Sequence, residues 1–133
     1  MRHLKTYTLY ERVSKETKIF ESVGGDLSDI FLEVNDELLW KAECWLAAKR
    51  QKWVVVIQTI DEDEEYELEG QTPPPIVIES IERAIDFMNV EGFTNYGITF
   101  DNEDDNRYEE ISLEEVSDLD VWSNDVIRIE FWK

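Results

Sequence analysis

Residues 53–60 read Trp-Val-Val-Val-Ile-Gln-Thr-Ile, an almost continuously apolar run in which β-branched side chains dominate. β-Branched residues are enriched in strands, and a run without polar alternation is typical of a strand that is covered on both faces. We therefore expect residues 53–60 to form a central strand of a sheet.

The segment after this run is acidic and ends in Pro73-Pro74-Pro75, which predicts a loop, because prolines interrupt helices and central strands. Beyond the prolines, apolar residues recur at intervals of three and four and are followed by Gly92, as expected of a helix with one buried stripe. The stripe consists of Ile78, Ile81, Ala84, Ile85 and Met88.

Three more elements are predicted toward the end of the chain. Residues 93–100 have the composition of a strand, although Asn95-Tyr96-Gly97 within it is turn-like. The pattern Ser112-x-x-Glu115 resembles a capping box and predicts a short helix that ends near Leu119. Residues 125–132 alternate between apolar and polar side chains and predict a last strand.

Upstream of residue 53, alternation predicts strands at residues 4–10 and 18–23, and Gly24-Gly25-Asp26 predicts a turn before a third strand at residues 30–34.

The stretch 36–50 fits two structures. As a helix it has Asn35 as its N-cap, acids at its start and bases at its end, with an apolar stripe of Leu38, Leu39, Ala42, Trp45 and Leu46. As a strand it has an alternating set of Trp40, Ala42, Cys44, Leu46 and Ala48. The charges at its two ends favour the helix.

Strands grouped around two or three helices, without strict βαβ alternation, indicate an α+β fold. A chain of 133 residues fits one domain, so we expect a single α+β domain over residues 1–133. Its sheet is predicted to be mostly antiparallel or mixed, with five to six strands. An apolar fraction of 42% and 16 aromatic residues predict a packed core despite the high charge.

The formal net charge of -19 is concentrated in one part of the chain. Residues 1–60 contain nine acids and nine bases, whereas residues 61–133 contain 23 acids and four bases. Such a balance argues against direct binding to nucleic acid or to an anionic membrane, because both need cations. We expect residues 61–133 to contribute an acidic face.

A single cysteine, Cys44, and a single histidine, His3, exclude intramolecular disulfides, multi-cysteine metal motifs and a three-histidine zinc site. The neighbours of Cys44 are Trp40, Trp45 and Leu46, which predict a buried, inert thiol. The first residues contain no apolar stretch that resembles a secretory signal, and the apolar runs are far shorter than the roughly 20 residues needed to cross a bilayer. We expect a cytoplasmic protein without a cofactor.

Two acidic runs follow two of the predicted strands. Residues 61–69 hold seven carboxylates and residues 101–110 hold six, and each run includes one tyrosine, Tyr66 or Tyr108. If the strands at 53–60 and 93–100 run parallel, both runs leave the sheet at the same end and form one continuous negative surface.

Such a surface can attract a basic partner, since clustered charge of one sign accelerates association. Tyr66 and Tyr108 would serve as aromatic anchors, because rim charges alone supply little affinity. The expected partner-binding residues are Asp61, Asp63, Glu64, Glu65, Tyr66, Glu67, Asp101, Glu103, Asp104, Asp105, Tyr108, Glu109 and Trp122. The alternative is two solvated loops that only keep the protein soluble. The density of carboxylates favours binding, because solubility needs far fewer.

The five tryptophans also divide into residues expected in the core and one that could contact a partner. Trp40, Trp45, Trp53 and Trp132 fall in predicted regular elements and are expected in the core. Trp122 lies between acids in a predicted loop, where it either covers the core or provides a third aromatic contact.

Calcium is a further alternative, because Asp101, Glu103 and Asp105 occupy positions 1, 3 and 5 of an EF-hand-like pattern. The pattern then fails, since Asn106 replaces the required Gly and Ser112 stands where Glu is needed. That leaves at most a weak surface site. Carboxylate catalysis has no specific signal in a chain with 32 acids, so we expect no catalytic residues.

The sequence therefore favours a non-enzymatic binding or inhibitor protein. Its size and charge fit an immunity-type protein, as bacteria use, which covers the basic active surface of a nuclease toxin or of a similar nucleic-acid-binding protein. The closest alternative is a mimic of DNA that acts on DNA-binding proteins, and a calcium-binding or carboxylate-based hydrolase domain is a weaker one.

Overall fold

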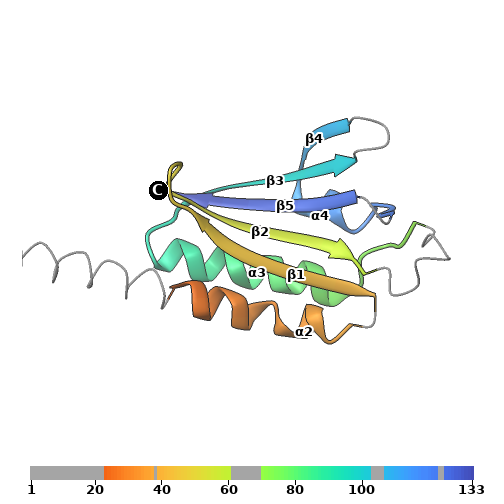
Figure 1. Ribbon diagram of the computed structural model, residues 1–133, viewed down its shortest axis with the longest axis horizontal. Helices are drawn as coiled ribbons and strands as arrows, with labels where there is room; N and C mark the ends of the chain where they lie inside the picture. Colours follow the sequence, from red (N-terminus) through yellow and green to blue (C-terminus); the bar gives the residue numbers. More distant parts are fainter. Residues whose placement is uncertain (1–22, 38, 61–69, 103–106, 123–124) are drawn as a thin grey trace, which may run out of the picture.

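The apolar run at 53–60 lies in β2, an interior strand of a five-stranded antiparallel sheet (Figure 1). The structure is a computed structural model that describes residues 23–37, 39–60, 70–102, 107–122 and 125–133. Its strands are β1 (Trp40–Ala47), β2 (Lys52–Thr59), β3 (Asn95–Asn102), β4 (Arg107–Ile111) and β5 (Asp125–Trp132). Its helices are residues 23–30, α2 (Leu32–Asn35), α3 (Pro75–Val90) and α4 (Leu113–Val116). The protein is a single small α+β domain, as predicted.

The strand order is β1-β2-β5-β3-β4, so β5 is inserted between β2 and β3. The register aligns Val55 and Ile98 with Ile129 of β5, one on each side. Because β5 is antiparallel to both neighbours, β2 and β3 run parallel to each other. Buried and half-buried residues alternate along β5 throughout, which confirms the predicted strand at 125–132.

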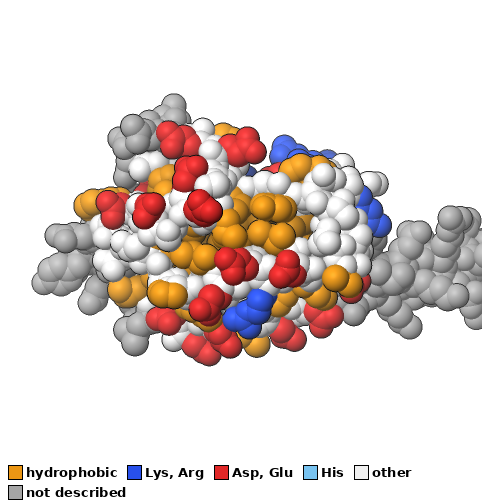
Figure 2. Space-filling view, turned by 180° about the vertical axis from the view of Figure 1, so that it is seen from behind, with side chains coloured by type: hydrophobic (Ala, Val, Ile, Leu, Met, Phe, Trp, Pro, Cys, Tyr) orange, Lys and Arg blue, Asp and Glu red, His pale blue; other side chains and the backbone are white. Residues whose placement is uncertain are grey.

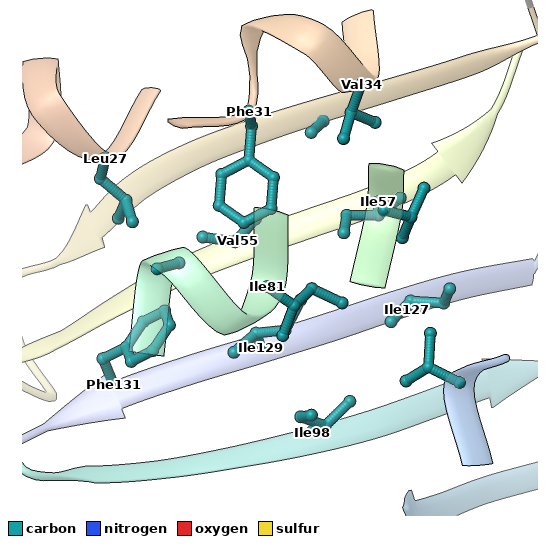
Figure 3. Close-up of a cluster of buried hydrophobic side chains, with 14 of the residues drawn as sticks. Leu27, Phe31, Val34, Val55, Ile57, Ile81, Ile98, Ile127, Ile129 and Phe131 are labelled. Atoms are coloured by element: carbon teal, nitrogen blue, oxygen red, sulfur yellow. The ribbon is translucent and has the colours of Figure 1, made fainter. Parts of the chain in front are cut away.

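The helices lie on one face of the sheet, behind it in the view of Figure 1. Figure 3 shows their apolar side chains meeting those of the inner strands. The core includes Leu27, Phe31, Val34, Val55, Ile57, Ile81, Ile98, Ile127, Ile129 and Phe131. On the other face of β2, Val54 and Val56 are only 5% and 8% exposed, between cross-strand neighbours rather than beneath a helix. Both faces of β2 are thus buried, but helices cover only one.

Helix α3 is the predicted helix at 78–88, extended at both ends. Its first residue is Pro75, so the third proline belongs to the helix and not to the loop. Proline is tolerated there because the N–H of the first helical residue has no partner within the helix. Gly92 follows the helix with a φ of 98°, a left-handed conformation that favours glycine, as predicted.

Two predictions upstream of β1 are wrong. Residues 24–26 and 30–34 form neither a turn nor a strand, because residues 23–30 are helical and α2 begins at Leu32. Gly24 has a packing cause instead, since a Cβ there would come within 2.8 Å of the Trp53 ring. The strand expected at residues 4–10 lies outside the described residues, as do residues 18–22 of the strand expected at 18–23, whose last residue, Val23, is helical.

The preferred helix at 36–50 is also wrong, and the alternative strand is right. Residues 40–47 form β1, which pairs in register with β2 from Trp40↔Thr59 to Ala47↔Lys52. Trp40 and Ala42 point into the core, as the alternating pattern requires. Favourable charges at the ends of a helix stabilise it by only fractions of a kcal/mol. Eight cross-strand pairs with β2 stabilise the strand by more than that.

We expect Ile81→Ala to lower the free energy of unfolding by about 2–5 kcal/mol, because Ile81 is fully buried between α3 and the sheet. Urea denaturation followed by circular dichroism measures this loss. The control is Arg83→Ala in the same helix, which breaks only the exposed 3.2 Å ion pair to Glu33 and should cost less than about 1 kcal/mol. Equal losses in the two variants would contradict the position of α3.

Candidate functional site: the acidic end of the sheet

The parallel strands β2 and β3 end on the same side of the molecule. Asn102 of β3 lies opposite Asp125, the first residue of β5, and the β2–β5 register continues toward Thr59 at that end. Both acidic segments, 61–69 and 103–106, are attached at this end of the sheet. The condition set by the sequence, that the two strands run parallel, is therefore met.

Most of the expected partner-binding residues belong to those two segments and lie outside the described residues. They are Asp61, Asp63, Glu64, Glu65, Tyr66, Glu67, Glu103, Asp104 and Asp105. The other four are described. Asp101 is partly buried in β3, Tyr108 and Glu109 are exposed in β4, and Trp122 is exposed between α4 and β5.

The sequence suggested that the second acidic run, residues 101–110, is a loop. The structure shows instead that both ends of this run lie in strands. Asp101 and Tyr108 are cross-strand partners in the β3–β4 hairpin, and β4 was not predicted at all. The Tyr108 side chain is 65% exposed, so it does not cap the core. An exposed aromatic ring beside a carboxylate is suited to contact with a partner.

Trp122 has a fixed backbone at the acidic end. Its N–H donates to Asp125 Oδ2 at 2.9 Å, and its carbonyl accepts from the Asp125 N–H at 2.9 Å and from Thr59 Oγ1 at 3.5 Å. A Cβ on Gly70 would lie 2.8 Å from the indole Nε1, so the indole needs a glycine there. The ring is nevertheless 47% exposed, which makes it a pre-positioned aromatic surface.

Four acidic residues that the site prediction missed lie on or just after α4. They are Glu114, Glu115, Asp118 and Asp120, and all four are exposed. The predicted capping box orients this segment, since the Glu115 N–H donates to Ser112 Oγ at 3.3 Å. Their place in the acidic half of the sequence was the available signal, but only the fold shows that α4 lies at the end where β5 begins (Figure 1).

The helix-covered side also carries an apolar hollow of about 520 Å³ between α3 and α4. Ile78 and Leu113 form part of its wall, and Glu82 and Glu114 lie at its edge. Figure 2 shows hydrophobic side chains near the middle of this side, with acidic side chains around them.

None of the four acids on or just after α4 forms an ion pair with another described residue. The ion pairs among the described residues are Lys41–Glu43, Lys52–Glu130 and Arg83–Glu33. Of these, Lys41–Glu43 lies near this end, because Lys41 is opposite Gln58 of β2. The acids on and just after α4 therefore have no cationic partner within the described residues, and such carboxylates favour association with cations.

The described residues show no constellation for metal binding or catalysis. Among them, no three His, Cys, Asp or Glu side chains are grouped closely enough to hold a metal ion. Of the EF-hand-like positions, only Asp101 is described. Cys44 is partly buried and contacts Ser28 Oγ at 2.8 Å.

The tryptophans follow the core prediction only in part. Trp40 and Trp53 are buried, at 4% and 5% exposure. Trp132 is partly buried, whereas Trp45 is 43% exposed, so its assignment to the core is wrong. It projects from the sheet face that no helix covers.

Comparison with protein-family models, with curated proteins and with solved structures gives no match. None of the helices that the structure describes is long and apolar enough to cross a membrane. The function must therefore be argued from the chain's own surface.

We expect Gly70→Ala to displace the Trp122 indole, because the added Cβ would meet Nε1 at 2.8 Å and the Asp120 Cβ at 3.1 Å. The cost should be about 1–3 kcal/mol. Indole N–H signals in an NMR spectrum measure the displacement, and urea denaturation measures the cost.

The matched control is Gly25→Ala, where an added Cβ meets nothing within 4 Å. Alanine there should leave the Trp122 signal unchanged and stabilise the helix by up to about 1 kcal/mol. An unchanged Trp122 signal in Gly70→Ala would contradict the close approach of ring and backbone.

Proposed function

We propose that the protein is a non-enzymatic binding protein whose acidic end covers a basic surface on another protein. One observation carries this proposal: β2 and β3 run parallel on either side of β5, so both acidic segments leave the sheet at the end that also bears the acids of α4. Two acidic stretches of the sequence thus begin at the end of the sheet where the described acids of α4 lie.

The aromatic groups at this end support a specific contact. Tyr108 and Trp122 are 65% and 47% exposed, and the backbone bonds of Trp122 fix its position before any partner arrives. In protein interfaces, such rigid aromatic side chains supply affinity, while the surrounding charges set the association rate and the choice of partner.

Among basic protein surfaces, those that bind nucleic acid are the most suitable targets for an acidic inhibitor, because they are built from Lys and Arg. The function we propose is that of an immunity-type inhibitor, which occupies the basic active surface of a nuclease toxin or of a similar protein. Its mechanism is steric occlusion: carboxylates pair with the Lys and Arg side chains of the partner, and Tyr108 and Trp122 fill apolar pockets.

The test is capture of a partner from the source organism, followed by stopped-flow measurement of association at several salt concentrations. We expect the triple variant Glu114→Gln/Asp118→Asn/Asp120→Asn to associate about 10-fold more slowly than wild type and with a weaker salt dependence. A second variant, Asp63→Asn/Glu64→Gln/Glu65→Gln, should behave in the same way.

The matched control is Asp26→Asn/Asp29→Asn/Glu91→Gln, which removes the same charge from exposed positions outside the acidic end. It should associate at nearly the wild-type rate. If all three variants slow equally, net charge alone drives binding; if none slows, the acidic end is not the site. Either result overturns the assignment.

The breadth of binding separates this function from DNA mimicry. At about 0.15 M salt, charges are screened beyond about 8 Å, so an immunity-type protein should ignore unrelated basic proteins. A DNA mimic would compete with DNA on several unrelated DNA-binding proteins. Competition assays with two such proteins distinguish the two functions.

A further inference from the structure

The end of the sheet opposite the acidic end carries a cluster of cations. The Lys and Arg side chains that the structure describes are those of Lys41, Lys49, Arg50, Lys52, Arg83, Arg128 and Lys133. Four of them, Lys49, Arg50, Lys52 and Lys133, come from the β1–β2 turn, the start of β2 and the residue after β5. Figure 2 shows basic side chains toward this end of the molecule.

These cations border a hollow of about 600 Å³. Val23, Leu46, Phe93 and Trp132 give it an apolar wall, and Arg50, Lys52 and Lys133 contribute to its lining beside a single acid, Glu91. The volume lies within the range of small-molecule sites, which are mostly apolar with a few polar groups that fix orientation. The lining of this hollow thus holds three cations and one acid in a chain with a net charge of -19.

The two lysines lie over the aromatic rings of the wall. Lys52 Nζ is 4.9 Å from the centre of the Trp132 ring and 3.3 Å from Glu130 Oε2, and Lys133 Nζ is 5.3 Å from the centre of the Phe93 ring. Neither Arg50 nor Lys133 forms an ion pair with any residue in the described ranges. Within the described residues, Arg50 and Lys133 therefore have no Asp or Glu partner beside the aromatic wall.

The turn that presents Arg50 has a constrained backbone. Gln51, which also lines the hollow, has a φ of 52°, a left-handed conformation that is uncommon for a residue other than glycine. The Arg50 and Gln51 N–H groups donate to the carbonyls of Ala47 and Ala48 at 3.1 and 3.3 Å. Arg50 is thus held at the rim by a closed turn.

We propose that this hollow binds a small organic anion with a flat apolar body, such as an aromatic carboxylate, sulfonate or phosphate ester. The apolar body packs against Phe93 and Trp132, and the anionic group lies between Arg50 and Lys133. A guanidinium matches planar oxyanions through paired N–H donors, and an ammonium adds a point charge. The site is independent of the proposed function, because it shares no residue with the acidic end.

The test is a titration of the full chain with naphthalene-2-sulfonate, followed by ¹H–¹⁵N NMR. We expect signals of Gln51, Phe93 and the Trp132 indole to shift together with one dissociation constant. The neutral probe 2-naphthalenemethanol has the same ring system without the charge, and it should bind about 10-fold more weakly or worse.

The variant Arg50→Gln/Lys133→Gln should weaken sulfonate binding by about 10-fold or more while leaving the affinity for the neutral probe nearly unchanged. The control Lys41→Gln/Arg83→Gln removes the same charge elsewhere and should bind sulfonate like wild type. Shifts scattered over the surface, equal affinity for the two probes, or equal losses in both variants would each overturn the site. None of these results bears on the partner-binding test at the acidic end.

Discussion

The pairing of β5 with both β2 and β3 is the interaction on which the rest of the structure depends. Ile129 at the middle of β5 lies opposite Val55 on one side and Ile98 on the other, so one strand joins the two halves of the sheet. The contact spans much of the chain, and such non-local pairing can form only after the intervening segments have been brought together. Without β5, β2 and β3 would share no neighbouring strand, and nothing would place the ends of these two strands on the same side of the molecule.

The insertion of β5 also explains which elements could be predicted. Local signals were sufficient for α3, whose stripe repeats every three and four residues, for the Ser112 cap of α4, and for the alternation of β5. They were insufficient for β1, because its sequence satisfies both periods and the choice is made by β2, which offers a ladder of partners.

The helical segment before β1 was missed for a different reason. Its buried residues Val23, Leu27, Phe31 and Val34 are spaced as a helix requires, but the two glycines at 24 and 25 resemble a turn. The Trp53 ring requires Gly24 to lack a side chain, and that ring lies far along the sequence. When a glycine is required by a contact with a residue far away in the sequence, its neighbours in the sequence do not reveal the reason for it.

The acidic site was predictable to the extent that it depends on composition. The carboxylate runs are visible in the sequence, but the fact that both begin at the same end of the sheet depends on strand order, which composition does not contain. The α4 acids and the fixed position of Trp122 depend on the same order, because both lie where the chain approaches the first residue of β5. The β3–β4 hairpin was hidden because its polar residues, including Asp101 and Tyr108, have none of the apolar alternation by which strands are identified.

The sheet separates the two charged ends by the length of its strands. An eight-residue strand spans about 26 Å, whereas charges in about 0.15 M salt are screened within about 8 Å. Cations at the β1–β2 turn therefore do little to weaken the field at the acidic end, and the acids do little to repel an anion from the hollow beside Trp132. Interspersed charges would cancel locally and leave neither surface. Separation along the strand axis is what the two proposed contacts require, with a basic partner at one end and a small anion at the other, in a chain with a net charge of -19. Electrostatic coupling between the two ends should then become appreciable only at low ionic strength, where the screening length approaches the length of the sheet.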